Sequence, residues 1–189
     1  CLAQILVFHS QDFSIINCQA QHIDLPLIVV HYTPWKHRLQ LLRTYQEMKK
    51  KGVKSIVFGD INICDSVKIQ SILCEEAGLI PRYPLWNKDY DWMFTEMQKR
   101  KIKAIITRVN TSMLEARWLG QTFNENVYQQ FKNLAIDSFG ERGEYHTTVV
   151  DADFFLKEIE FTFYEDRIGN KLQLKLSSHY HKRNIYRLI

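Results

Sequence analysis

The stretch Ser55-Ile56-Val57-Phe58-Gly59-Asp60 decides the fold class of this chain. Its apolar run is short and rich in β-branched and aromatic side chains, which is typical of a strand buried on both faces. Residues 25–30, Leu-Pro-Leu-Ile-Val-Val, have the same character. Between the two runs, residues 39–50 carry apolar side chains at helical spacing, and Gly52 follows as a stop signal. A strand, a helix and a strand in this order predict a parallel sheet covered by helices.

The same alternation extends to both sides of this stretch. We expect helices over residues 12–22, 67–77, 89–100 and 124–134. We expect further strands over residues 2–8, 103–108, 147–150, 158–164 and 171–177, an extended connector over 81–86 and a hairpin turn at 168–170. The predicted fold is therefore α/β, with a parallel sheet sandwiched by helices over residues 1–82 and a smaller α+β domain over residues 83–189.

The composition is that of a folded protein with its own core. Of the 189 residues, 46% are hydrophobic and 13% are aromatic, which excludes a disordered chain. The net charge is +4. Its basic clusters, such as residues 49–51 and 99–101, lie at the ends of expected helices, where cations are favoured by the helix dipole. We therefore interpret them as solvated helix ends and expect no nucleic-acid partner.

The cysteines and the hydropathy pattern indicate the compartment. The four cysteines show neither paired metal-ligand spacing nor a dense disulfide framework, so we expect reduced thiols in the cytoplasm. No apolar run approaches the roughly 18–20 residues that span a bilayer, so we expect no membrane partner.

Gly59 and Asp60 are the first candidate site. They follow the expected strand over residues 55–58 directly. In open parallel sheets, ligands bind beyond the carboxyl ends of the strands, and a glycine there lets the backbone approach a ligand. The alternative is that Asp60 serves only as a turn or helix-capping residue.

A second candidate site occupies the loop of residues 138–147, Ser-Phe-Gly-Glu-Arg-Gly-Glu-Tyr-His-Thr. Two glycines three apart alternate with two glutamates three apart, and none of these residues serves a core pattern. Two carboxylates beside a histidine can bind a cation, orient an amine, or act as acid and base. The alternative is a hairpin whose glutamates point into solvent.

Taken in order along the chain, these motifs resemble a known family. The resemblance rests on Gly59-Asp60-Ile61, residues 74–79 (Cys-Glu-Glu-Ala-Gly-Leu), Pro84-Leu85-Trp86, Leu119-Gly120 and residues 140–147. Together they resemble the diphthine–ammonia ligase family, a branch of the PP-loop ATP pyrophosphatases with a HUP-type nucleotide-binding fold. The resemblance covers nearly the whole chain, and its most specific element is the loop of residues 140–147.

The resemblance implies a ligase activity. ATP adenylates the carboxylate of diphthine, a modified histidine of translation elongation factor 2, and ammonia then displaces AMP. It implies ATP and Mg²⁺ as cofactors, and ammonia and elongation factor 2 as partners. Gly59 and Asp60 would bind the nucleotide, with Asp60 a metal contact. Glu141 and Glu144 would be catalytic, and the remaining loop residues would bind the substrate: Gly140, Gly143, Tyr145, His146 and Thr147.

One departure from the family pattern affects the expected activity. The phosphate-binding sequence Ser-Gly-Gly-Lys-Asp-Ser, which follows the family's first strand, does not occur in these 189 residues. The backbone N–H groups of such a loop carry most of the phosphate binding. We therefore expect an N-terminally incomplete family member with weak or no ATP turnover. Two alternatives stay open: an inactive nucleotide- or partner-binding module, and a tRNA-associated PP-loop relative.

Overall fold

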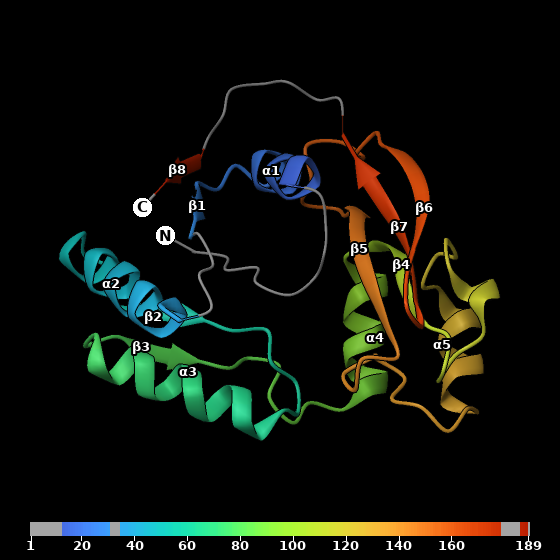
Figure 1. Ribbon diagram of the computed structural model, residues 1–189, viewed down its shortest axis with the longest axis horizontal. Helices are drawn as coiled ribbons and strands as arrows, with labels where there is room; N and C mark the ends of the chain where they lie inside the picture. Colours follow the sequence, from blue (N-terminus) through green and yellow to red (C-terminus); the bar gives the residue numbers. More distant parts are fainter. Residues whose placement is uncertain (1–12, 31–34, 179–185, 189) are drawn as a thin grey trace. The chain divides into compact units, whose positions relative to one another are not determined.

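The computed structural model describes residues 13–30, 35–178 and 186–188, and the chain forms two compact units (Figure 1). The first unit contains residues 25–30, 35–88 and 186–188. The second contains residues 13–24 and 89–178. The boundary predicted between residues 82 and 83 stays a prediction; the division between the compact units falls after residue 88, and residues 13–24 belong to the second unit. The strand expected over residues 2–8 lies outside the described residues.

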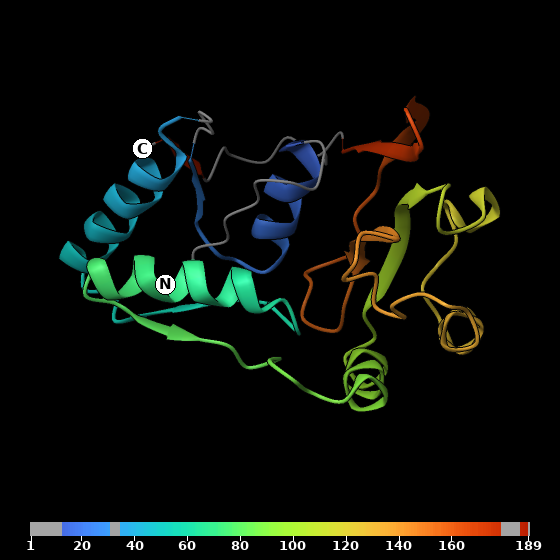
Figure 2. The ribbon, with the colours of Figure 1, turned by 60° about the horizontal axis from the view of Figure 1, so that its bottom comes forward.

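The first unit is built from short parallel strands and two helices. Strand β1 (Leu27–Val29) pairs in parallel with β8 (Tyr186–Leu188), and β2 (Ser55–Val57) pairs in parallel with β3 (Ile80–Arg82). The helices are α2 (His37–Lys50) and α3 (Cys64–Glu76), which confirms the helices expected there. Figure 2 shows them next to each other along the β2–β3 pair.

The core of the first unit lies between its helices and β2. Tyr45 of α2 and Cys74 of α3 are fully buried, and both belong to the cluster that contains Ile56 of β2. The prediction that this strand is buried on both faces is wrong, because Val57 is 42% exposed. The sequence also missed strand β3. Its residues are Ile-Pro-Arg, and proline cannot donate a hydrogen bond to a strand ladder.

The second unit contains a four-stranded antiparallel sheet. Its strands are β4 (Lys103–Asn110), β5 (Tyr145–Asp151), β6 (Thr162–Ile168) and β7 (Lys171–Ser177), in the order β5-β4-β7-β6. Its helices are α1 (Phe13–His22), α4 (Tyr90–Lys99) and α5 (Glu125–Lys132), with a 3₁₀ turn at Ala116–Trp118. The helices and the hairpin turn agree with the sequence prediction, and Gly169 in the turn has φ +58°.

Helices pack against the sheet of the second unit in two clusters. The larger cluster is aromatic: Phe94 of α4 stacks on Tyr128 of α5 with ring centroids 4.4 Å apart, and both pack with Ile106 of β4. The smaller cluster joins Ile15 of α1 to Val150 of β5. These two clusters fix the sheet that positions the loop before β5.

Two details of the sheet differ from the sequence prediction. Strand β4 pairs antiparallel with both neighbours, although it follows the alternating part of the chain. Strand β6 begins at Thr162, whereas the apolar pattern predicts a strand from residue 158. Ile159 lies beside β5 instead, where its N–H donates to the Val150 carbonyl at 2.8 Å. It is 2% exposed, so its burial explains the apolar signal.

The fold is therefore mixed α/β, as predicted, with small parallel sheets and a separate antiparallel sheet. In the part of the chain that the structure describes, Cys18, Cys64 and Cys74 are free thiols. Among the helices of residues 13–30, 35–178 and 186–188, none combines the length and the hydrophobicity of a membrane-spanning segment.

Candidate functional site

The segment between α5 and β5 forms a closed loop around one carboxylate. The Glu144 side chain is 1% exposed. Its Oε1 accepts the N–H of Asp137 at 2.8 Å, and its Oε2 accepts the N–H of Arg142 at 3.0 Å. Both carboxylate oxygens therefore bond to the backbone of the loop itself. In this arrangement Glu144 positions the loop of residues 137–144.

A second carboxylate ties the loop to helix α4. The Asp137 side chain accepts the N–H of Phe139 at 2.9 Å, which forms a turn, and the hydroxyl of Tyr90 at 2.7 Å. Asp137 is 8% exposed. Tyr90 also packs on Phe139, with ring centroids 4.8 Å apart. The loop is thus attached both to itself and to the first turn of α4.

Tyr145 explains why the loop needs a glycine. Its hydroxyl donates to the Ser138 carbonyl at 2.6 Å. Burial raises the pKa of this phenol, and the nearby carboxylates of Asp137 and Glu144 raise it further, so it stays a neutral donor. Gly140 has φ +75°, and a Cβ there would lie 2.9 Å from the Tyr145 carbonyl oxygen. Only glycine fits this close approach.

The residues of the motif differ in burial. Gly140, Glu144 and Tyr145 are buried. Glu141, Gly143, His146 and Thr147 are half-buried, and Arg142 is exposed. Tyr145, His146 and Thr147 are the first residues of β5 rather than part of the loop, and the catalytic and substrate-binding roles of the motif stay predictions. Of the two glutamates that the sequence predicts as catalytic, Glu144 is buried and Glu141 is half-buried.

The sequence analysis assigned no role to three residues whose hydrogen bonds shape this loop. Asp137, Ser138 and Tyr90 contribute hydrogen bonds that shape it. A local signal exists for Asp137, because an Asp that bonds the backbone two residues later is a common turn former. Tyr90 has no such signal, because it lies 47 residues away in the chain.

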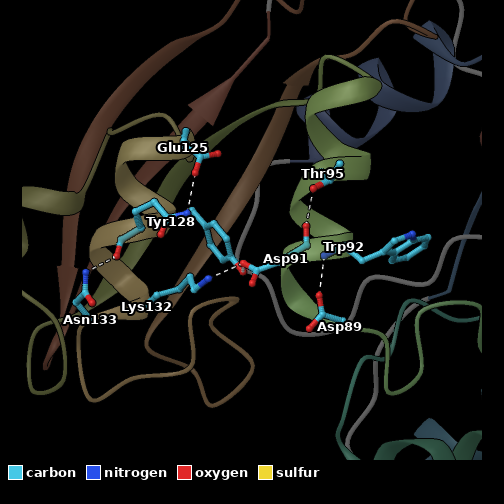
Figure 3. A network of polar contacts seen from close by, with 9 residues as sticks. Asp89, Asp91, Trp92, Thr95, Glu125, Tyr128, Lys132 and Asn133 are labelled. Atoms are coloured by element: carbon cyan, nitrogen blue, oxygen red, sulfur yellow. Dashed lines mark hydrogen bonds and ion pairs between the residues drawn. The ribbon is translucent and has the colours of Figure 1, made fainter.

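A polar network joins α4 to α5 and fixes the helix that carries Tyr90 (Figure 3). The Asp91 carboxylate accepts the Tyr128 hydroxyl at 2.8 Å and the Lys132 ammonium at 2.6 Å. The hydrogen bond from Lys132 is the largest cause that lowers the pKa of Asp91. Asp89 caps α4 by accepting the N–H of Trp92 at 2.9 Å. These contacts hold α4 in place under the loop.

Gly59 and Asp60 lie in the first unit, directly after β2. Gly59 is exposed and Asp60 is half-buried. The preceding residue, Phe58, donates its N–H to the Arg82 carbonyl at 2.9 Å and stacks on Tyr83 with ring centroids 5.2 Å apart. Within the described residues, no three His, Cys, Asp or Glu side chains gather at a distance that would hold a metal ion. Asp60 stays a predicted metal contact without a set of partners.

Comparison with known proteins finds a family similarity in the second unit. Residues 89–178 match the family described as Diphthamide synthase C-terminal domain. The match covers just under half of the chain and spans the loop of residues 137–147. The resemblance to diphthine–ammonia ligases that the motifs indicated is therefore confirmed.

Several individual relatives are named diphthine–ammonia ligase. The chain is 27% identical over 125 residues to the diphthine–ammonia ligase of Rattus norvegicus, a match that covers 64% of this chain and 45% of the relative. It is 32% identical over 91 residues to that of Mus musculus, covering 46% of this chain and 34% of the relative. For the Schizosaccharomyces pombe ligase the identity is 30% over 93 residues, covering 48% and 15%. The chain thus spans less than half the length of these relatives.

Proposed function

We propose that this chain takes part in ATP-dependent amidation of the diphthine–ammonia ligase type, and that its second unit supplies the acceptor side of the reaction. The observation that carries the proposal is the closed loop of residues 137–147, which lies within the part matched to the diphthamide synthase C-terminal domain. The name of the relatives indicates the reaction, a ligation of ammonia to diphthine.

The loop suits this reaction because it separates positioning from chemistry. The carboxylates of Glu144 and Asp137 accept hydrogen bonds from backbone N–H groups and from the Tyr90 hydroxyl. These bonds keep the loop in one conformation. Glu141, in contrast, is half-buried. In the proposed function, Glu141 orients the ammonia and accepts the proton that the nitrogen loses on attack. His146 and Thr147, at the start of β5, contact the acceptor.

The first unit has the nucleotide role in this proposal, through Gly59 and Asp60. The family resemblance implies that ATP supplies the adenylate that activates the acceptor carboxylate. The described residues around Asp60 do not form a set of ligands that fits Mg²⁺. We therefore assign no step to a metal ion.

The test measures acceptor binding before turnover. The full chain is titrated with a diphthine-bearing peptide and with the same peptide carrying unmodified histidine. We expect tighter binding of the diphthine peptide by at least about tenfold, which corresponds to about 1.4 kcal/mol. Equal affinity for the two peptides would contradict the proposed acceptor role.

A second experiment tests the chemistry of Glu141. The chain is incubated with ATP, ammonium chloride and diphthine-bearing elongation factor 2, and the amide is detected by mass spectrometry. The variant Glu141→Gln should slow amide formation by about 100-fold or more, because a general base contributes a factor of that size. The control is Glu115→Gln, which removes the same charge from an exposed surface position of the same unit. If both variants slowed amide formation equally, the effect would come from the lost negative charge, and the catalytic role proposed for Glu141 would be wrong.

A further inference from the structure

A row of polar side chains crosses the antiparallel sheet of the second unit. The register places Arg108 of β4 opposite His146 of β5 on one side and opposite Gln173 of β7 on the other. Gln173 in turn lies opposite Asp166 of β6. Directly opposite residues on neighbouring strands point to the same face, with Cβ atoms about 5 Å apart. The Arg108 row, defined by these four residues, is therefore one continuous polar strip.

A β-bulge in β4 aims Arg108 toward this strip. The register shifts between Ile106 and Arg108, so Thr107 is the extra residue of the bulge. Its hydroxyl meets that of Thr148 at 3.0 Å, and both threonines are buried. Bulges re-aim side chains and are common beside functional sites. Here the bulge returns Ile106 and Val109 to the aromatic core while Arg108 pairs with His146.

In the described part of the chain, Arg108 is half-buried without an anion partner, whereas two other cations of this sheet have one. Lys103, on the same strand, binds Glu158 at 2.5 Å, and Lys175 of β7 binds Asp166 at 2.9 Å. Within the residues that the structure describes, the Arg108 guanidinium has neither an ion pair nor a hydrogen bond. It is half-buried, so water solvates it only in part. A partly desolvated charge without a partner is costly, which favours binding of an anion there.

The carboxylate of Asp166 does not fill this role. Its oxygens accept from Lys175, from the Gln173 amide at 3.3 Å and from the N–H of Arg167 at 2.9 Å. It also stands two strands away from Arg108, a separation of about 10 Å between the backbones. Asp166 is therefore the last residue of the Arg108 row. It does not compensate the charge of Arg108.

We infer that Arg108 is the anchor of an oxyanion-binding site on this face of the sheet, which takes a carboxylate or a phosphate group beside His146. A guanidinium presents a planar fork of N–H donors that matches both groups. His146 lies two residues after Glu144 in the chain, so the proposed anion site is next to the loop that Glu144 holds. The assignment of the anion to the amidation reaction rests on the proposed function. Its source is then either the acceptor carboxylate or the phosphate of AMP.

The experiment titrates the ¹⁵N-labelled full chain with two pairs of probes at constant ionic strength. Butyrate is compared with neutral butyramide, and AMP with adenosine. The readouts are the Arg108 Nε–H resonance and the backbone amides of His146 and Gln173. We expect at least one anion to cause saturable shifts that its neutral counterpart does not cause. A response to butyrate identifies a carboxylate site, a response to AMP identifies a phosphate site, and either supports the inference.

Matched variants test whether Arg108 is responsible. Arg108→Gln should weaken the responsive anion by at least about tenfold, and Arg108→Lys by less, because lysine keeps the charge without the planar fork. Arg100→Gln, an exposed position of the same unit, should change affinity by less than about twofold. If Arg108→Gln does not fold, the lysine variant alone decides, since it must bind more weakly than the parent chain.

Two results overturn the inference: no shift with either anion, or unchanged affinity in the Arg108 variants. Neither result depends on ATP turnover. Anion binding without amide formation would support the oxyanion site and contradict the proposed function. Amide formation without Arg108-dependent anion binding would support the proposed function and contradict the oxyanion site.

Discussion

Replacing Glu144 by glutamine tests whether this side chain holds the loop before β5. The glutamine has nearly the same shape, but it offers one acceptor oxygen where the glutamate offers two. One of the two backbone donors, the N–H of Asp137 or of Arg142, then faces an NH₂ group instead of an oxygen. The site is 1% exposed, so water does not replace the lost acceptor.

The expected loss of stability follows from these contacts. A buried donor left without a partner costs about 1–3 kcal/mol, and the remaining hydrogen bond weakens by about 1 kcal/mol when its acceptor loses its charge. The neutral glutamine also avoids the desolvation penalty of a buried charge, which offsets part of this loss of stability. We expect Glu144→Gln to lower the free energy of unfolding of the second unit by about 2–3 kcal/mol.

The assay is urea unfolding of the full chain, followed by tryptophan fluorescence, with the midpoint and slope fitted separately for each transition. The control is Glu115→Gln, an exposed substitution that should change stability by less than about 0.5 kcal/mol. If Glu144→Gln unfolds within that same limit, the carboxylate does not hold the loop, and the positioning role assigned to Glu144 is wrong.

Two further predictions concern the loop and its support. Gly140→Ala should destabilise the chain by about 2–3 kcal/mol, because its Cβ would meet the Tyr145 carbonyl oxygen at 2.9 Å in addition to the cost of a positive φ. Gly143→Ala, at φ +85° with open space around it, should cost only about 1 kcal/mol, and equal losses in urea unfolding would contradict the role of close approach. For Asp91, the folded pKa is lowered by Lys132, so its contribution to stability is present above the unfolded pKa and declines as the pH falls through the folded value. Asp91→Asn should therefore differ in stability from the parent chain at neutral pH, and the difference should shrink in acid; a difference that stays constant with pH would contradict this coupling.

The sequence predicts well those elements whose pattern is local. Helix α5 is capped by Asn124, whose side chain accepts the N–H of Val127 at 3.1 Å, and such a cap is visible from residue types alone. The hairpin turn at Gly169 is another local signal. In contrast, β3 and the place of α1 beside β5 depend on contacts between distant residues. No periodicity in the sequence encodes them.

The loop shows the same limit at the level of single side chains. The motif places Glu141 and Glu144 in equivalent positions, each directly after a glycine. The positive φ angles of Gly140 and Gly143 remove the alternation that would otherwise tell inward from outward side chains. The direction of each carboxylate is set by the backbone donors of Asp137 and Arg142, which the residue spacing does not reveal.

The different surroundings of these two glutamates change what the motif means chemically. A carboxylate that accepts two backbone N–H groups in a buried site is held in one place and has little freedom to take up a proton or meet a substrate. Glu144 is in that state, whereas Glu141 is only half-buried. The pair is therefore better understood as one positioning residue and one candidate catalytic residue than as two equivalent acids. In the proposed function, the Glu141 carboxylate and the Arg108 guanidinium, which lies opposite His146, suit a reaction in which an anionic group is bound and an amine attacks it.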